Sequence, residues 1–273
     1  MQRALIAFLI ILAALQTNSQ AQQAEICHIA SSGFYVSDRQ KGVLIDALFA
    51  DGMDGDPVAS DALNKQMEGA SGKFSNVRLI HASHMHEDHM KAKAILRHLR
   101  ANEAAIALMP KQARTLMVAA GMAPNEKSVI SPNLAQGEKQ VIDGLSFPVT
   151  LYAITHGEGT GVDNMAIAIN VGGKTIMHVG DMYASREEII EAGLDKIEID
   201  YLMLPFWYLY RSERASMIKE TLNAKHIIPM HFALESSEWM QSMGGLEQVR
   251  NASYNALDNI IKLDQEMKCI ALN

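Results

Sequence analysis

The chain has 273 residues, of which 48% are hydrophobic and 20% are charged, and its formal net charge at pH 7 is −7. This composition excludes a disordered chain and provides enough apolar residues for one large core or two modest cores. The acidic balance disfavours a long polyanion such as nucleic acid as the principal partner.

Residues 1–21 have the pattern of a secretory signal peptide. Arg3 gives a positive start, an apolar run follows from Ala4 to Leu15, and small residues precede a cleavage position at Ala21. The apolar run is short for a membrane span, which favours cleavage over retention as an N-terminal anchor. We therefore expect an exported bacterial protein, periplasmic or secreted, with one domain over residues 22–273 and no membrane span after cleavage.

Cys27 and Cys269 are the only cysteines, and they lie near the two ends of the expected mature chain. Export permits a disulfide between them, whereas two separate buried thiols remain the alternative, because the sequence does not show how far apart their Cα atoms lie. Neither cysteine is spaced with a histidine as in a zinc finger, so neither is expected to bind metal.

The first half of the mature chain is predicted to open with an antiparallel meander. Its predicted elements are strands over 26–30, 34–37 and 43–47, a helix over 61–68, a strand ending near residue 80, a helix ending at residue 100, a strand over 105–109 and a helix over 111–120. Asp46 closes the third strand, where its carboxylate either supports a ligand loop or is only a polar strand end.

The second half alternates strands and helices. Its predicted elements are a broken strand over 141–155, a hairpin of 165–171 and 175–179, a helix that starts at the capping box of residues 185–188, a strand over 201–204, a helix over 212–222, a strand over 226–229, a long helix over 246–263 and a strand over 269–272. The strands form two runs, each closed by helices, and no repeat or low-complexity linker interrupts them. This order favours a single layered α/β domain.

Residues 81–89 read H-A-S-H-M-H-E-D-H and contain four of the ten histidines of the chain. The segment lies between a predicted strand and a predicted helix. Residues two apart in an extended segment point the same way, so His84 and His86 can bind one metal ion. Asp88 and His89 fall where the helix begins, so that they can reach a second ion.

Three further candidate ligands each follow a predicted strand: His156, Asp181 and His231. Loops at one end of a sheet are where sites are commonly built. A single histidine at a strand end is more often structural, but together with the histidine-rich segment these residues complete a set.

This ordered set resembles the metallo-β-lactamase superfamily. The H-x-H-x-D-H motif of that family matches residues 84–89 in every position, and its later histidine, aspartate and histidine match His156, Asp181 and His231. The resemblance extends from about Glu25 onward. It implies a four-layer αββα sandwich, the metallo-β-lactamase fold, with the site along one edge of the two sheets.

The resemblance also implies how the ligands divide. One ion would be held by His84, His86 and His156, the other by Asp88, His89 and His231, with Asp181 bridging the two. Nitrogen and carboxylate donors without a thiolate suit two Zn²⁺ ions, although Fe or Mn fits the same donors in some relatives. Because the second motif position is His86 and not glutamate, the pattern departs from the di-iron, oxygen-reducing branch of the family and favours hydrolysis.

The resemblance implies a metal-bound hydroxide as the nucleophile, because metal coordination lowers the pKa of water toward about 7. Asp88 could orient this hydroxide as a catalytic residue as well as bind metal. Class B β-lactamases lack the bridging aspartate, whereas lactonase-like and phosphodiesterase-like relatives carry it. We therefore expect cleavage of an ester, lactone or phosphodiester bond in a small-molecule substrate. The alternatives are a periplasmic class B-like β-lactamase and a non-catalytic metal-binding scaffold.

Three other residues are candidates for supporting roles. His178 lies three residues before Asp181 and either supports a metal ligand or packs within its strand. Trp207 and Tyr208 belong to an aromatic run over 206–210, which either walls the substrate pocket or packs in the core. His81 is expected to be structural. The sequence does not indicate an oligomeric state.

Overall fold

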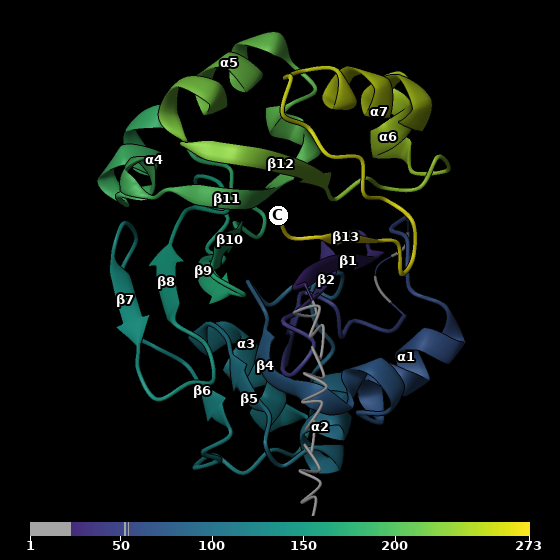
Figure 1. Ribbon diagram of the computed structural model, residues 1–273, viewed down its shortest axis with the longest axis vertical. Coiled ribbons are helices and arrows are strands. Elements are labelled where there is room, and N and C mark those ends of the chain that lie inside the picture. Colours follow the sequence, from purple (N-terminus) through teal and green to yellow (C-terminus); the bar gives the residue numbers. More distant parts are fainter. Residues whose placement is uncertain (1–22, 52, 54) are drawn as a thin grey trace, which may run out of the picture.

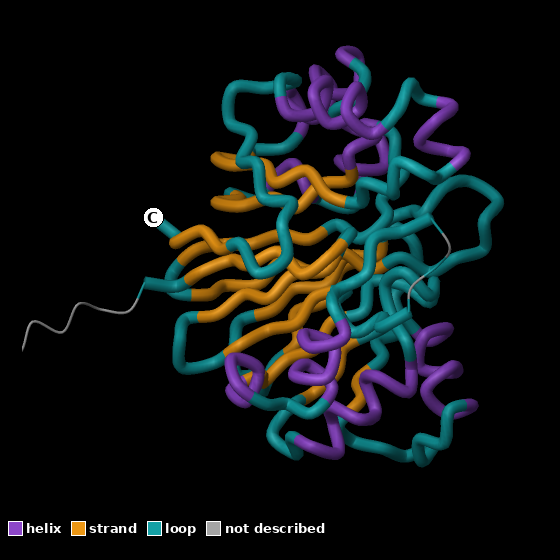
Figure 2. Tube along the Cα trace, turned by 90° about the vertical axis from the view of Figure 1, so that its right-hand side faces the viewer, coloured by secondary structure: helices purple, strands orange, loops and turns teal. Residues whose placement is uncertain are grey.

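The computed structural model describes residues 23–51, 53 and 55–273, and this part of the chain forms four layers (Figure 1). The strands lie in the middle and the helices gather on the two outer sides (Figure 2). The predicted αββα sandwich is therefore confirmed. The expected signal peptide and residue 22, where the mature domain was expected to begin, lie outside the described residues.

The first sheet has seven strands in the order β13-β1-β2-β3-β4-β5-β6. They are β1 (Glu25–Ala30), β2 (Gly33–Ser37), β3 (Gly42–Ile45), β4 (Val77–His81), β5 (Ile106–Leu108), β6 (Val129–Ile130) and β13 (Cys269–Ala271). The first three form the predicted antiparallel meander, whereas β3 to β6 pair in parallel. The outer face of this sheet is covered by α1 (Asp61–Glu68), α2 (Ala92–Ala101) and α3 (Lys111–Ala119) (Figure 1).

The second sheet has six strands in the order β12-β11-β10-β9-β8-β7. They are β7 (Lys139–Ile142), β8 (Val149–Ala153), β9 (Met165–Val171), β10 (Lys174–His178), β11 (Ile199–Pro205) and β12 (Ala224–Met230). The predicted hairpin is confirmed as the antiparallel pair β9 and β10. The helices on this side of the molecule are α4 (Arg186–Glu191), α5 (Ser212–Thr221), α6 (Glu238–Ser242) and α7 (Leu246–Tyr254) (Figure 1).

Short 3-10 turns complete the described elements: η1 (Gly72–Asn76), η2 (Leu194–Lys196) and η3 (Phe206–Tyr208).

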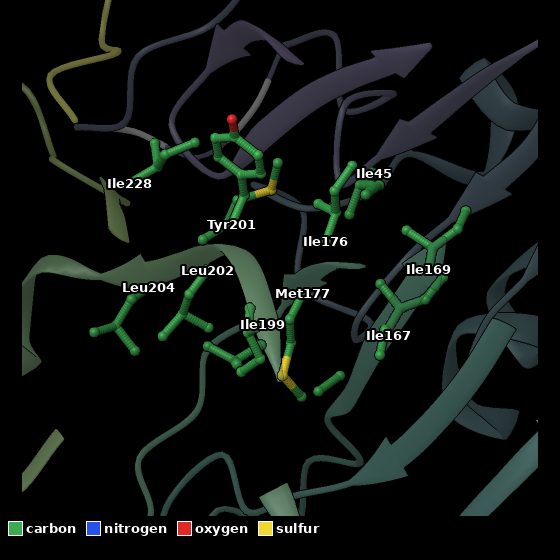
Figure 3. Packing of buried hydrophobic residues seen from close by; sticks show 14 of the residues in the cluster. Ile45, Ile167, Ile169, Ile176, Met177, Ile199, Tyr201, Leu202, Leu204 and Ile228 are labelled. Carbon is green, nitrogen blue, oxygen red and sulfur yellow. The ribbon is translucent and has the colours of Figure 1, made fainter. Parts of the chain in front are cut away.

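The largest apolar cluster contains residues of both sheets and extends to α4 and α5 on the outer side of the second sheet. Successive side chains of β3 point to opposite faces of its sheet. Val43 and Ile45 belong to this cluster, whereas Leu44 belongs to the cluster under α1 to α3. Figure 3 shows side chains of the central cluster contributed by both sheets, among them Ile45 and Ile176. Strands buried on both faces read as short, nearly continuous apolar runs, and these runs with their flanking turn residues identified them in the sequence.

The last predicted helix is too long. It ends at Tyr254 and not at Leu263. The following segment instead runs beside β12, where Ile227 donates its N–H to Asn259 O at 3.0 Å and accepts from Ile261 N at 2.8 Å. This long-range pairing replaces the helical hydrogen bonds. The short elements β6 and α6 were not predicted, because two to five residues carry too little periodicity.

The two ends of the described chain are tied together. Cys27 of β1 lies opposite Cys269 of β13 in an antiparallel pair, and the two form a disulfide across a sequence separation of 242. Of the two alternatives for these cysteines, the disulfide is the one that the structure contains. Among the residues that the structure describes, no helix combines the length and apolarity needed to cross a membrane.

Candidate metal centre

Seven histidine and aspartate side chains from four separate loops meet at one edge of the sandwich. The loop between β4 and α2 contributes His84, His86, Asp88 and His89, and the loops after β8, β10 and β12 contribute His156, Asp181 and His231. Strands β8, β10 and β12 run in the same direction, since β9 is antiparallel to both β8 and β10, and β11 is parallel to both β10 and β12. Their carboxyl ends therefore lie at the same edge, where loops commonly carry functional groups.

The seven side chains form two compact clusters. One consists of His84, His86 and His156, and the other of Asp88, His89, Asp181 and His231. Within each cluster, one donor atom per residue lies within 4.8 Å of every other. The grouping agrees with the division between two ions that the family resemblance implied.

Asp181 lies between the two clusters. Its Oδ2 is 3.8 Å from His84 Nε2 and 3.7 Å from His156 Nε2 on one side, and 3.1 Å from His231 Nε2 on the other. Its Oδ1 is 3.1 Å from His89 Nε2. One carboxylate can therefore reach donors of both clusters, as a bridging ligand must.

Several buried donor and acceptor atoms at this edge have no hydrogen-bond partner among the described residues. They are Asp88 Oδ1, His89 Nε2, both ring nitrogens of His156, Asp181 Oδ1 and both ring nitrogens of His231. A buried polar atom without a partner costs about 1–3 kcal/mol, so such atoms rarely gather by chance. Imidazole nitrogens and carboxylate oxygens that converge in this way fit divalent metal ions.

The charges within the second cluster compensate one another. Burial by itself would lower the pKa of His231, but Asp181 and Asp88 outweigh it and raise that pKa from 6.5 to about 10. Burial likewise opposes charge on His89, yet Asp181, Asp46 and Asp88 hold the pKa of His89 well above its ordinary value. The metal-free protein therefore carries protons on both histidines at neutral pH, next to ionised carboxylates.

The first cluster has the opposite character. Burial and the nearby His89 hold the pKa of His84 well below 6.5, and burial also lowers the pKa of His156. Both imidazoles are therefore neutral at pH 7. A neutral imidazole is the form that binds a metal ion.

Asp46 supports the loop between β4 and α2, which carries four of the candidate ligands. Its carboxylate accepts hydrogen bonds from Ser83 N at 2.7 Å and from Ser83 Oγ at 2.6 Å, and it lies 2.7 Å from His89 Nδ1. Asp46 is completely buried, and its φ of 45° is in the left-handed region. The contact to Nδ1 leaves Nε2 of His89 facing the site, so that of the two roles considered for Asp46, supporting a ligand loop is the one that the structure contains.

His178 and Asn164 position the loop that carries Asp181. His178 accepts a hydrogen bond from Gly180 N at 3.0 Å through Nδ1 and donates from Nε2 to Ser32 O at 2.9 Å. Asn164 accepts from Asp181 N at 3.2 Å and donates to Val179 O at 3.0 Å. His178 thus supports a candidate ligand while packing within its strand. The sequence carried no signal for Asn164, because its partners lie in another loop.

Gly180 shows why glycine precedes the aspartate. Its φ is +57°, and a Cβ at this position would lie 2.6 Å from Ser83 Cβ. Any larger residue would push the loop that carries Asp181 away from the loop that carries Ser83.

A cavity of about 730 Å³ opens beside the cluster edge. His156, Asp181 and His231 are among the residues that line it, and so is the aromatic Trp207. The ring centroids of Trp207 and His231 are 5.2 Å apart. Trp207 therefore lines the cavity, which agrees with the first of the two roles considered for it, that of a pocket wall.

Two other aromatic or histidine positions lie elsewhere. Tyr208 is completely buried, and its hydroxyl donates to Ala184 O at 2.9 Å, so it packs in the core instead of lining this cavity. His81 is buried, and its Nε2 lies 2.9 Å from Met165 O, in agreement with the structural role expected for it.

Comparison with known proteins identifies relatives of most of the chain. A family model described as the β-lactamase superfamily domain matches residues 25–231. A UPF0173 metal-dependent hydrolase from Symbiobacterium thermophilum is 27% identical over 214 residues, which cover 76% of this chain and 84% of that protein.

Two solved structures illustrate the similarity of fold. A possible metal-dependent hydrolase from Veillonella parvula superposes with a TM-score of 0.61 at 15% identity, covering 92% of this chain and all of that one. The diiron β-hydroxylase CmlA from Streptomyces venezuelae superposes with a TM-score of 0.60 at 11% identity, covering 92% of this chain and 54% of CmlA.

Proposed function

Because the chain belongs to the β-lactamase superfamily, we propose that it is a dinuclear metal-dependent hydrolase. The observation that carries this proposal is the position of Asp181, whose carboxylate lies within 3.8 Å of histidine nitrogens of both clusters. The relative from Symbiobacterium thermophilum is itself described as a metal-dependent hydrolase, which agrees with this assignment.

Each cluster would hold one ion. His84, His86 and His156 bind the first, Asp88, His89 and His231 bind the second, and Asp181 bridges them. Zinc suits these nitrogen and oxygen donors best, and iron or manganese accepts the same set. The diiron enzyme CmlA has a similar fold, so fold alone does not select the metal.

Two bound ions would supply a water of lowered pKa and polarise the bond under attack. The residues of the chain orient the reactants. Asp88 Oδ2 lies 3.1 Å from His231 Nε2, while its buried Oδ1 has no hydrogen-bond partner among the described residues. Asp88 Oδ1 can therefore accept a hydrogen bond from the attacking water and orient it.

The substrate proposed is a small molecule with an ester, lactone or phosphodiester bond. A cavity of about 730 Å³ has the size of a site for a small molecule. We also propose that the protein is exported, and the Cys27–Cys269 disulfide supports this because disulfides persist in oxidising compartments.

Metal analysis and a substrate panel test the proposal. The purified protein is analysed for bound metal, and turnover is measured with chromogenic esters, lactones, bis-aryl phosphodiesters and a cephalosporin. We expect two metal ions per chain and turnover of at least one of the first three classes. Asp181→Ala should abolish turnover because the bridging ligand is lost.

Glu87→Gln is the matched control, since Glu87 lies in the same ligand loop but is exposed and pairs with Lys91 at 2.7 Å. It should retain activity. Undiminished activity of the Asp181→Ala protein would refute the dinuclear assignment. Bound metal without turnover of any class would favour a non-catalytic scaffold, and hydrolysis of the cephalosporin alone would favour a β-lactamase.

A further inference from the structure

Two arginines line the cavity beside the metal centre. Arg211 and Arg214 share it with Asp181 and His231. Arg211 is exposed and Arg214 is half-buried. Among the described residues, the arginines that form ion pairs are Arg39, Arg97, Arg186 and Arg250. The two cavity arginines therefore present positive charge that no described carboxylate neutralises.

Helix stability does not explain this pair. Arg211 is the N-cap of α5, where it makes no side-chain capping hydrogen bond, and Arg214 lies in the first turn. Positive side chains at the N-terminus of a helix oppose its dipole and destabilise it by a few tenths of a kcal/mol, up to about 1 kcal/mol. An anion in the cavity would reverse this unfavourable interaction.

Aromatic rings hold Arg214 in position. Its guanidinium carbon lies 4.3 Å from the ring centroid of Tyr183 and 5.8 Å from that of Tyr208, and it donates a hydrogen bond to the Tyr183 hydroxyl. Tyr183 is only two residues from Asp181, so this contact joins the arginine to the loop of the bridging carboxylate. A guanidinium fixed in this way loses little entropy when it binds an oxyanion.

The cavity lining also includes two tryptophan rings, those of Trp207 and Trp239. The ring centroids of Trp207 and Trp239 are 6.1 Å apart, and the Trp207 ring is also next to His231. Trp239 remains 44% exposed although it is a large apolar side chain. A planar apolar group can therefore stack on these rings while it reaches the metal centre.

We propose that the substrate is an amphiphilic anion: an oxyanion group, carboxylate or phosphate, is bound by Arg211 and Arg214, and an apolar or aromatic group lies against Trp207 and Trp239. This inference rests on the proposed function, because it names the substrate class of the same site. The two arginines are specificity-determining residues, whereas the metal ligands carry out the reaction.

A pair of substrates of the same length tests the preference. The mono-4-nitrophenyl ester of glutaric acid carries a terminal carboxylate, and 4-nitrophenyl valerate does not. We expect the metal-loaded protein to cleave the anionic ester with a kcat/KM about tenfold higher, through a lower KM, since a hydrogen bond to a charged group contributes about 1.5–3 kcal/mol. Arg211→Gln and Arg214→Gln should lower kcat/KM for the anionic ester toward that for the valerate ester and so remove the preference.

Arg100→Gln is the matched control, because Arg100 is exposed near the end of α2, on the other outer layer of the sandwich. It should leave the preference unchanged. Equal kcat/KM for the two esters, or a preference that survives in both cavity variants, would overturn the proposal.

Binding can be measured without turnover. The chain has only two tryptophans, and both line the cavity, so their fluorescence reports occupancy. We expect 3-phenylpropionate and phenyl phosphate to quench it, and 3-phenylpropionamide to bind about tenfold more weakly. Each arginine variant should bind the anions and the amide equally weakly. This result is expected both with bound metal and after chelator treatment.

The two measurements separate the inference from the proposed function. Arginine-dependent anion binding without hydrolysis of any substrate class would refute the hydrolase and leave the anion site. Hydrolysis without arginine-dependent anion binding would support the hydrolase and refute the anion site. Anion binding that is unchanged in both variants, or that disappears with the metals, would assign the anion to the metal ions and overturn the inference.

Discussion

Replacement of Asp46 by asparagine tests whether this buried carboxylate holds the metal centre together. Asp46 is completely buried and is not among the seven candidate ligands, yet it contacts Ser83 N, Ser83 Oγ and His89 Nδ1 within 2.7 Å. The three histidines nearby, His89 first, hold the pKa of Asp46 well below its usual range although burial would raise it. Asp46 is therefore ionised, and it faces a protonated His89 in the metal-free protein.

The expected loss of stability follows from these contacts. An asparagine can still accept from Ser83 N, but its amide cannot replace the charged oxygen that Ser83 Oγ and His89 share. A hydrogen bond to a charged group contributes about 1.5–3 kcal/mol, and removal of one partner of a buried pair costs about 3–5 kcal/mol. We expect Asp46→Asn to lower the free energy of unfolding by about 3–5 kcal/mol in the metal-free form.

Urea unfolding at pH 7.5 with a chelator measures this loss, and competition with a metal indicator measures metal affinity. The affinity should fall about 10- to 100-fold, because the orienting contact of His89 is weakened. Asp143→Asn, at an exposed position in the turn between β7 and β8, is the control and should change neither quantity. A loss below about 1 kcal/mol with unchanged metal affinity would refute the supporting role of Asp46.

Two further predictions concern protons and the disulfide. The pKa of His231 is raised to about 10 and that of His89 is raised well above 6.5 in the metal-free protein, so both histidines carry protons at neutral pH and must lose them to bind metal. Calorimetric titration with zinc in buffers of different ionisation enthalpy should show the release of about two protons, and no release would contradict these assignments. Replacement of Cys27 and Cys269 by serine should cost about 2–5 kcal/mol in urea unfolding, because the disulfide closes a long loop in the unfolded chain. If the serine protein, the reduced wild type and the oxidised wild type all had the same free energy of unfolding, the disulfide would not constrain the unfolded chain.

Local spacing was sufficient to select the candidate ligands and to predict most of the secondary-structure elements. The donor types at 84, 86, 88 and 89 are adjacent in the chain, and each later ligand directly follows an apolar run that reads as a strand. Strand patterns and turn residues extend over only a few residues, so they can be recognised within each segment of the sequence. The same locality explains the error in the last helix, because the pairing of Ile227 with Asn259 and Ile261 is a contact between distant segments.

The support of the site and the character of its cavity required the folded chain. Asp46 lies 37 residues from Ser83, and Trp207 approaches His231 and Trp239 only when the layers pack. The positive charge of Arg211 and Arg214 is visible in the sequence, but its position beside Asp181 is not. The sequence by itself therefore determined the candidate ligands, through local chemistry. What surrounds them depends on how the two sheets and their helices are placed, since packing alone brings distant side chains within contact distance.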